Sequence, residues 1–475
     1  MAHGMCIFAG IMSISTDRFG ERLHRRLGLW SAVAVLVGST IGSGIFRTPA
    51  SVAARVDDVP LFLAAWAMGG VVVLCGALTY AELAAAFPRS GGIYVFIRET
   101  FGPLPAFLFG WAEVWIIRPG AFGAIGITAS AYTLRTLGAD PAAGVLALGP
   151  LDIRAEQLLG AVYILIVAAV NYYGIHRGAV LQNLSTAFKV GALALLIIVG
   201  FALGRSETGL DGILAQRTDV GLSPFLLAMV AILWAYDGWA DLAFVGGEVK
   251  DPVRNLPRAL LIGTAIVVVL YLGANLVYLY LIPMASLKGA ELVAVNVAQR
   301  VVGEVAVVTV AAAIAVSTFG TLNGSMMTAP RIFFAMAERG DFPRAIARMD
   351  PQTGAPTGAV ILMGVLGSLF ILIRGFTQLA DQFIIGIWPF YALAVAGVFR
   401  LRRQHPRAAD GYRTWGYPVV PSIFLLGALF LLGNYLVSEP LLFSVDIAVI
   451  LTGIPAFYTW RRFGRTTPPD SGSRS

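Results

Sequence analysis

Two apolar stretches of the chain contain short runs that combine glycine with hydroxyl or carboxyl side chains. The first run is Gly38-Ser39-Thr40-Ile41-Gly42-Ser43-Gly44, and the second is Leu233-Trp234-Ala235-Tyr236-Asp237-Gly238-Trp239. Each glycine in a helix interior costs about 1 kcal/mol relative to alanine. Backbone groups left unpaired in apolar surroundings are tolerated only where they face a cavity or a ligand. We therefore expect each run to break a helix.

The two breaks together offer complementary groups for a zwitterion. A half-helix that starts after Gly42 presents free N–H groups and a positive dipole end, which suit a carboxylate. Carbonyl groups freed before Asp237 can accept hydrogen bonds from an ammonium group. For the first run alone, close helix packing through Gly38 and Gly42 is an equally good interpretation. The second run favours a binding site, because paired breaks in two halves of a chain are typical of a transporter.

The composition indicates that these runs lie in membrane-spanning helices. Of the 475 residues, 57% are hydrophobic and 13% are charged, whereas about 25% of a soluble protein is charged. These values exclude a disordered chain and argue against a large soluble enzyme. The net charge of +7 is expected from cytoplasmic loops rich in Lys and Arg. No basic stretch is interleaved with aromatic residues, so we expect no binding of nucleic acid.

A membrane-spanning helix needs about 20 apolar residues, and the sequence predicts twelve such helices. They occupy residues 27–46, 59–81, 103–134, 158–174, 178–204, 220–245, 259–287, 305–330, 351–373, 382–399, 414–438 and 440–460. Most of the 34 lysines and arginines fall in connections on the same side as the N-terminus. We therefore predict a multi-pass protein of the cell (cytoplasmic) membrane with both termini in the cytoplasm.

The sequence predicts neither a cofactor nor a metal site. Cys6 and Cys75 have no metal-binding spacing, and the four histidines fall in tails or loops. The chain has no phosphate-binding loop of the kind that ATP-driven pumps use. No pair of His or Asp residues on adjacent spans indicates catalysis, so we expect no enzyme. A membrane sensor built on a transporter fold is a further alternative, but the short tails argue against it.

Several segments, in this order, resemble the L-type amino acid transporter family of the amino acid–polyamine–organocation superfamily. They are GSGIF at 42–46, IIRP at 116–119, NYYG at 171–174, EVKDPVRNLP at 248–257, FGTLNG at 319–324 and RIFF at 331–334. The resemblance covers about residues 28–462. It implies an all-α membrane protein with the LeuT-type fold, in which helices 1–5 and 6–10 are inverted repeats and helices 1 and 6 are discontinuous.

This fold implies a division of the chain into five parts. They are a cytoplasmic N-terminal tail (1–27), a first inverted repeat (28–204), a second (205–403), peripheral helices 11 and 12 (404–463) and a cytoplasmic tail (464–475). The loop 135–155 contains no cysteine, so the disulfide that ties family members to a heavy subunit cannot form. We expect a prokaryotic-like member that works as a monomer or a weak homo-oligomer.

The resemblance also implies a set of substrate-binding residues. They are Thr40, Ile41, Gly42, Ser43 and Gly44 of helix 1, Trp234, Ala235, Tyr236, Asp237 and Gly238 of helix 6, and Trp388 of helix 10. Trp234 occupies the position of an aromatic gate. Asp237 stands where eukaryotic members usually have glycine. This carboxylate has two interpretations: an N-cap for the second half-helix, or a group that attracts a substrate ammonium or carries a coupling proton.

Lys189 interrupts the fifth span, where an ionisable residue is a functional candidate by default. The alternative is a lysine that extends its amine to the cytoplasmic headgroups. In relatives with lysine at this position, it fills the place of a structural sodium ion. The resemblance thus implies that Lys189 bridges carbonyl groups near Gly38 and helix 8, where Ser317 and Thr318 are the candidates, which makes transport sodium-independent. A further interpretation is that Lys189 exchanges a coupling proton.

Other charges have more ordinary interpretations. Glu113 and Arg118 are five residues apart in one helix, so we expect each to bond a neighbouring helix instead of the other. Asp241 is expected only to face water. Four residues at the inner surface could form a gate or lie in solvated loops: Glu248, Arg254, Arg331 and Arg339.

The sequence therefore predicts a secondary active transporter that exchanges or imports neutral L-amino acids by alternating access. Its partners would be the amino acid substrate and the lipid bilayer. Proton-coupled symport of amino acids, or of polyamines and cationic amino acids, is the alternative. Exchange, proton symport and uniport are not distinguished by the residues.

Overall fold

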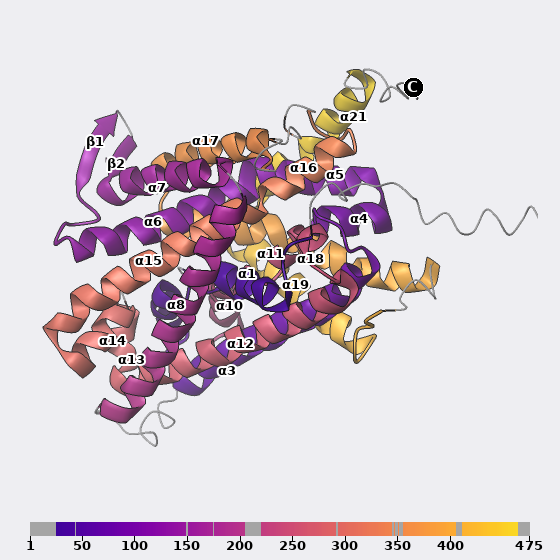
Figure 1. Cartoon of the computed structure of the whole chain (residues 1–475). Coiled ribbons are helices and arrows are strands. Elements are labelled where there is room, and N and C mark those ends of the chain that lie inside the picture. Colours follow the sequence, from indigo (N-terminus) through magenta and orange to yellow (C-terminus); the bar gives the residue numbers. More distant parts are fainter. Residues whose placement is uncertain are drawn as a thin grey trace, which may run out of the picture.

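The computed structural model describes residues 25–42, 44–148, 151–173, 175–204, 220–290, 293–343, 346, 350, 355–404 and 411–463 (Figure 1). Nearly all of this chain is helical, apart from a hairpin of β1 (Gly144–Leu148) and β2 (Leu151–Arg154). The tail predicted at 464–475 and nearly all of the tail predicted at 1–27 lie outside the described residues.

Among the described residues, nine helices are long and apolar enough to cross a membrane. They are α3 (Val59–Ala86), the continuous run of α5 (Pro103–Ala112), η1 (Glu113–Ile117) and α6 (Arg118–Thr136), then α7 (Ala155–Tyr172), α8 (Ile175–Leu203), α12 (Pro252–Leu281), α15 (Glu304–Thr328) with α16 (Pro330–Glu338), α18 (Phe376–Gln404), α19 (Val419–Ser438), and α20 (Pro440–Leu451) with α21 (Gly453–Phe463).

Two further helices are long and apolar enough only when taken together, and they meet at a bend of 41°: α1 (Leu29–Thr40) and α2 (Gly44–Arg55). Counted as one broken span, they bring the number among the described residues to ten. Two shorter apolar helices, α10 (Leu222–Tyr236) and α17 (Thr357–Ile373), fall inside the predicted spans 220–245 and 351–373. The count of twelve spans stays a prediction, because these two are short.

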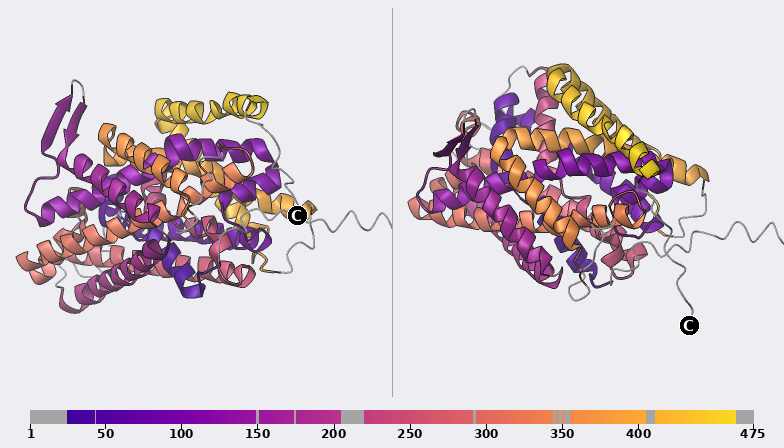
Figure 2. Two further views of the ribbon diagram at one scale, coloured as in Figure 1. Left: turned by 45° about the horizontal axis from the view of Figure 1, so that its top comes forward. Right: turned by 90° about the horizontal axis from the view of Figure 1, so that it is seen from above.

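The other helices are short. They are α4 (Ile93–Phe101), α11 (Asp241–Phe244), η2 (Gly246–Glu248), α13 (Met284–Lys288) and α14 (Val293–Val302). In Figure 1 the hairpin, α13 and α14 lie at one end of the helices, and α4 and α21 lie at the other. The views in Figure 2 place α20 and α21, in yellow, on the outside of the bundle.

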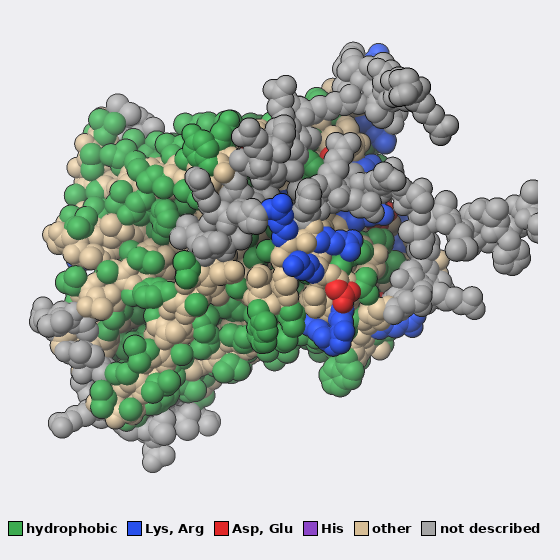
Figure 3. Space-filling view, in the orientation of Figure 1, with side chains coloured by type: hydrophobic (Ala, Val, Ile, Leu, Met, Phe, Trp, Pro, Cys, Tyr) green, Lys and Arg blue, Asp and Glu red, His purple; other side chains and the backbone are tan. Residues whose placement is uncertain are grey.

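The surface between the two ends is apolar. Many large hydrophobic side chains are exposed there, among them Leu195 and Ile198 of α8, Val269 of α12 and Leu429 of α19. Exposed apolar side chains along spanning helices are suited to lipid. The side chains of Lys and Arg gather instead toward the end where α12 begins (Figure 3). We call this the basic end.

At the basic end a buried carboxylate connects three segments. Glu82 of α3 is 1% exposed and accepts hydrogen bonds from Arg402 Nε at 2.8 Å and Nη2 at 2.7 Å. Its Oε2 also accepts from the backbone N–H of Thr414 at 2.8 Å. The Arg402 guanidinium lies 3.9 Å from the centroid of the Tyr417 ring. These contacts attach α18 and the start of α19 to α3.

We predict that Arg402→Gln destabilises the protein. Removing one partner of a buried ion pair leaves the other charge uncompensated, which costs about 3 kcal/mol or more. The thermal midpoint of the purified variant in detergent should fall by several degrees. Arg403→Gln is the matched control, because Arg403 is exposed on the same turn. Equal midpoints for the two variants would contradict a stabilising role for the pair.

Candidate functional site

The two glycine-containing runs break their helices, as the sequence predicts. The helix α1 ends at Thr40 and α2 begins at Gly44, while α10 ends at Tyr236 and α11 begins at Asp241. Between α10 and α11, Gly238 has a φ of +106°, which L side chains rarely adopt. Both breaks therefore leave backbone groups outside regular helix.

The two broken helices cross in direct contact. A Cβ atom on Gly44 would lie 2.3 Å from Ala235 Cα, and one on Gly238 would lie 2.7 Å from the carbonyl carbon of Ser39. Only glycine allows the backbones to approach so closely at these two positions. The sequence thus fixes the crossing point by residue size as well as by backbone conformation.

A small cavity of about 30 Å³ lies at this crossing. Its lining comes from α1, α2, α6, α10, α11, α15, α18 and the segments between the half-helices: Ser39, Thr40, Gly42, Gly44, Arg118, Ala121, Ile125, Trp234, Asp237, Gly238, Asp241, Thr321, Ser325 and Phe383. The site therefore combines backbone groups, hydroxyls and three charged side chains.

Six of the predicted substrate-binding residues line this cavity: Thr40, Gly42, Gly44, Trp234, Asp237 and Gly238. Ser43 lies outside the described residues. Ala235 packs against Gly44, and the carbonyl oxygen of Ile41 accepts a hydrogen bond from Thr321 Oγ1 at 2.9 Å. Tyr236 is directed away, since its hydroxyl donates to the carbonyl oxygen of Trp66 at 3.2 Å.

Trp388 does not line the cavity. Its ring stacks on Phe424 of α19 with centroids 5.2 Å apart and planes inclined by 10°. Phe383, on the same helix α18, lines the cavity instead and lies edge-on to Trp234 at 5.2 Å between centroids. Five residues on a helix turn the side chain by about 140°, so Phe383 and Trp388 face different neighbours. The sequence alone missed Phe383 because nothing distinguishes it from other aromatic residues of a span.

Arg118 and Glu113 bond each other, contrary to the prediction. Arg118 Nε donates to Glu113 Oε2 at 2.7 Å, and both side chains are buried. The reason is η1, a π-helical turn over Glu113–Ile117. In a π turn the repeat is wider, and side chains five residues apart are superposed. A regular α-helix would have separated this pair.

The same arginine reaches Asp241, which is buried instead of facing water. Arg118 Nη2 lies 3.4 Å from Asp241 Oδ1, and Thr328 Oγ1 donates to Asp241 Oδ2 at 3.3 Å. Asp241 is 4% exposed. Arg118 therefore connects the π turn to α11, the short helix that follows the second break.

Asp237 is not an N-cap, so this interpretation is wrong. Its Oδ1 accepts a hydrogen bond from the hydroxyl of Tyr391 on α18 at 2.7 Å. The next helix begins four residues later at Asp241, and its N-terminus has no side-chain cap. A capping residue immediately precedes the first helical turn, whereas Asp237 belongs to the end of α10. Its carboxylate remains beside the cavity.

Lys189 bonds the carbonyl oxygen of Gly38 at 2.7 Å and Thr321 Oγ1 at 2.8 Å. The lysine is 1% exposed, which excludes an amine extended to the headgroups. The partner on α15 differs from the predicted Ser317 and Thr318. Thr318 Oγ1 donates to the carbonyl of Ile314, whereas Thr321 lies one turn beyond Ser317 and reaches the break.

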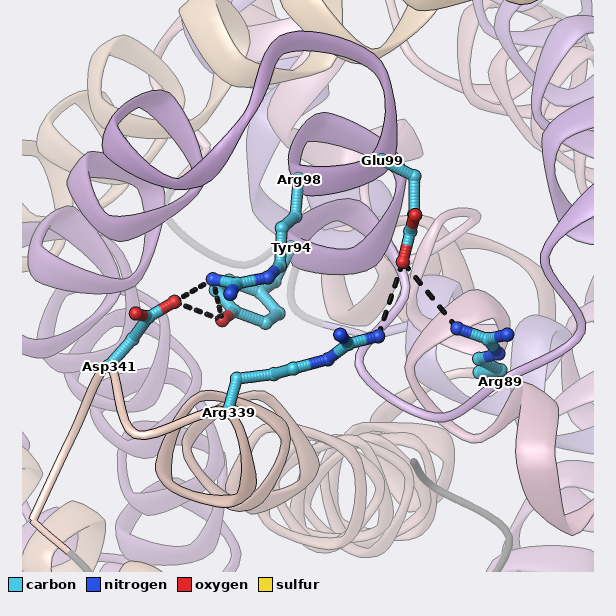
Figure 4. Close-up of polar contacts among 6 residues, drawn as sticks. All are labelled: Arg89, Tyr94, Arg98, Glu99, Arg339 and Asp341. Atoms are coloured by element: carbon cyan, nitrogen blue, oxygen red, sulfur yellow. Dashed lines mark hydrogen bonds and ion pairs between the residues drawn. The ribbon is translucent and has the colours of Figure 1, made fainter. Parts of the chain in front are cut away.

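The basic end carries a network of ion pairs, drawn in Figure 4 for α4 and the end of α16. Glu99 lies 3.5 Å from Arg89 and 3.3 Å from Arg339. Asp341 accepts hydrogen bonds from Arg98 and from Tyr94, the latter at 2.6 Å.

A further buried pair, Arg331 Nε with Glu248 Oε1 at 3.0 Å, joins α16 to the segment after the second break. Of the four residues expected either to form a gate or to lie in solvated loops, Glu248 and Arg331 pair with each other. Arg339 pairs with Glu99, and Arg254 is exposed.

A family model described as amino acid permease matches residues 27–460, which include both breaks and the whole cavity. The chain belongs to the amino acid permease family. The permease is accordingly a multi-pass helical membrane protein of an amino acid transport family. The resemblance to L-type amino acid transporters is confirmed by individual relatives.

Three relatives match nearly the whole permease. The serine/threonine exchanger SteT of Bacillus subtilis (strain 168) is 30% identical over 443 residues, which cover 93% of this chain and 98% of the exchanger. The b(0,+)-type amino acid transporter 1 of Mus musculus is 31% identical, with 95% and 91% covered. The large neutral amino acids transporter small subunit 2 of Mus musculus is 33% identical, with 92% and 81% covered. These relatives are transporters and not enzymes.

We predict that Gly44→Ala weakens ligand binding by the permease. The new methyl group would lie 2.3 Å from Ala235 Cα, so α2 and α10 must separate and the cavity must change shape. Binding of neutral amino acids to purified protein, measured by calorimetry, should weaken at least tenfold. Gly191→Ala in α8 is the control, because nothing lies within 4 Å of its added carbon. Unchanged affinity in Gly44→Ala would show that the crossing does not shape the site.

Proposed function

We propose that the permease is a secondary transporter that exchanges neutral L-amino acids across the membrane, without sodium, by alternating access. The observation that carries this proposal is the crossing of two broken helices over one cavity. The N-terminus of α2 at Gly44 would receive the substrate carboxylate, because its N–H groups have no partner within the helix. Carbonyl groups at the end of α10 would accept hydrogen bonds from the ammonium group.

The residues around the cavity support a preference for neutral side chains. Ala121, Ile125, Phe383 and Trp234 supply apolar contact area. The roles of Ile41, Ser43, Ala235, Tyr236 and Trp388 in substrate contact are part of the same proposal and rest on the family resemblance. No catalytic role is proposed for any of these residues.

The position of Lys189 supports sodium independence. Its amine holds the carbonyl of Gly38 in α1 and the hydroxyl of Thr321 in α15. A bound cation between these helices would need the same oxygen atoms as ligands. We therefore propose that the ammonium group of Lys189 permanently takes the place of a bound cation between α1 and α15.

Side-chain contacts close the cavity on both sides, and this closure supports alternating access. Trp234 packs on Phe383 and Phe376, and the guanidinium of Arg47 lies 4.6 Å from the Phe376 centroid. The ion pairs of α4 and α16 close the basic end. We propose that the basic end faces the cytoplasm, that residues 28–204 and 205–403 form the inverted repeats, and that no disulfide-linked partner is needed.

The test is uptake of radiolabelled neutral L-amino acids into liposomes that contain the purified permease. We expect accumulation only when unlabelled amino acid is present inside, because an exchanger returns to the outside with bound substrate. Replacing external Na⁺ with choline should leave the initial rate unchanged.

Each contrary result overturns a specific part of the proposal. A requirement for Na⁺ would contradict the role of Lys189, and uptake into empty liposomes would contradict obligatory exchange. No uptake under any gradient would contradict transport itself. Protein-free liposomes give the background.

A second candidate, transport of cationic amino acids, is favoured by the carboxylate of Asp237. Two aspartates line the cavity, Asp237 and Asp241, against the single cation Arg118. Arg118 bonds Asp241, whereas Asp237 bonds only the neutral hydroxyl of Tyr391 among the described residues. An uncompensated carboxylate in a cavity attracts a positive group on the substrate side chain.

Asp237→Asn distinguishes the two candidates. For a site that uses this charge, inhibition of uptake by arginine or lysine should weaken at least tenfold, while inhibition by leucine or serine changes little. The measurement is competition against one labelled neutral amino acid at fixed pH. Equal inhibition constants in wild type and variant would show that Asp237 does not select substrates by charge.

A further inference from the structure

Four exposed cations gather where α12 begins. We call them the basic patch: Arg25, Lys250, Arg254 and Arg258. None of them forms an ion pair with a described residue. The acidic residue in the same stretch is Asp251, which is also exposed. The four cations outnumber this one carboxylate, so the patch has a net positive charge that attracts an anionic partner.

Backbone hydrogen bonds bring the two parts of the patch together. Leu27 and Val249 form a parallel bridge, in which Lys250 N donates to the carbonyl of Leu27 at 2.8 Å. Glu248 O accepts from the N–H groups of Arg26 and Leu27 at 2.8 and 2.9 Å. Residues before α1 and before α12 are therefore fixed side by side.

Arg254 and Arg258 lie on the side of α12 that faces lipid. The exposed residues farther along this helix are Ala265, Val269 and Leu276. They follow Arg258 by 7, 11 and 18 residues, which are whole numbers of helical turns to within about 20°. The two arginines thus continue an apolar, lipid-exposed stripe at its basic end.

The length of α12 places these arginines at the level of the headgroups. The helix has 30 residues, or about 45 Å at 1.5 Å per residue. A bilayer is about 40–45 Å thick with both headgroup layers. Arg254 is the third residue of α12 and Arg258 the seventh, so both guanidinium groups can reach the headgroup layer.

Trp30, on the neighbouring helix α1, indicates the same headgroup level. It is 70% exposed in the first turn of α1, and α1 packs against α12 where Leu36 contacts Gly263. Exposed tryptophan is typical of the boundary between lipid tails and headgroups. The patch therefore lies beside an indole that can cover the upper part of an acyl chain.

We propose that the basic patch binds the phosphate headgroup of an anionic phospholipid in the leaflet at the basic end. The phosphate bonds Arg254 and Arg258 from the membrane side and Arg25 and Lys250 from the loop side. The acyl chains lie along the apolar stripe of α12 and against Trp30. The bound lipid stabilises the pairing of residues 25–28 with 248–250, and hence the position of Glu248, whose carboxylate bonds Arg331.

Native mass spectrometry of the purified protein tests this proposal. The protein is titrated with phosphatidylglycerol and, separately, with zwitterionic phosphatidylcholine of the same acyl chains. We expect the double variant R254Q/R258Q to bind phosphatidylglycerol roughly twentyfold more weakly than wild type. Its binding of phosphatidylcholine should not change.

Two further variants complete the design. R154Q/R300Q removes the same charge from the opposite end, in β2 and α14, and should retain phosphatidylglycerol binding. R25Q/K250Q removes the loop half of the patch without altering α12, which keeps the test decisive if R254Q/R258Q fails to fold. It should also weaken binding of the anionic lipid.

Three results would overturn the proposal. They are unchanged phosphatidylglycerol binding in both patch variants, equal loss in R154Q/R300Q, and equal affinity of wild type for the two lipids. Displacement of the lipid by millimolar inorganic phosphate would show a free anion site instead of a membrane one. None of these readouts depends on transport, so they are independent of the proposed function.

Discussion

The close crossing of the two broken helices is the constraint on which the rest of the site depends. It requires residues without side chains at Gly44 and Gly238, because a Cβ atom on either residue would lie within 2.7 Å of the backbone of the other helix. Both helices are interrupted at this crossing, and several carbonyl groups there lose their partners within the helix. Any stable version of this fold must satisfy those groups from neighbouring helices.

The neighbouring helices do so with three polar side chains. Tyr271 donates to the carbonyl of Thr40 at 2.8 Å, Thr321 to that of Ile41 at 2.9 Å, and Lys189 to that of Gly38 at 2.7 Å. Each donor comes from a different helix, namely α12, α15 and α8. These three donors therefore stabilise the break in α1. The backbone groups that face the cavity are those that remain available to a ligand.

The sequence predicted the parts of the site that depend on residue type. Glycine runs located both breaks, and a lone lysine in a span identified Lys189 as a functional candidate. The contact of Lys189 near Gly38 was implied by the family resemblance. The sequence did not predict parts that depend on local geometry. The π turn at Glu113–Ile117 reverses the expectation for Arg118, because spacing arguments assume a regular α-helix. The directions in which the Phe383 and Thr321 side chains point also depend on how far each helix is rotated about its axis. That rotation is set by tertiary packing and cannot be read from residue spacing.

The charges around the cavity would make the entry of a substrate ammonium group electrostatically favourable. Glu113, Asp237 and Asp241 surround a single cation, Arg118, and Glu113 Oε1 has no hydrogen-bond partner among the described residues. Burying carboxylates without compensation is costly, so a positive group that enters the cavity relieves a cost already present in the folded protein. Under the proposed function, the charged lining would therefore favour a substrate that carries an ammonium group.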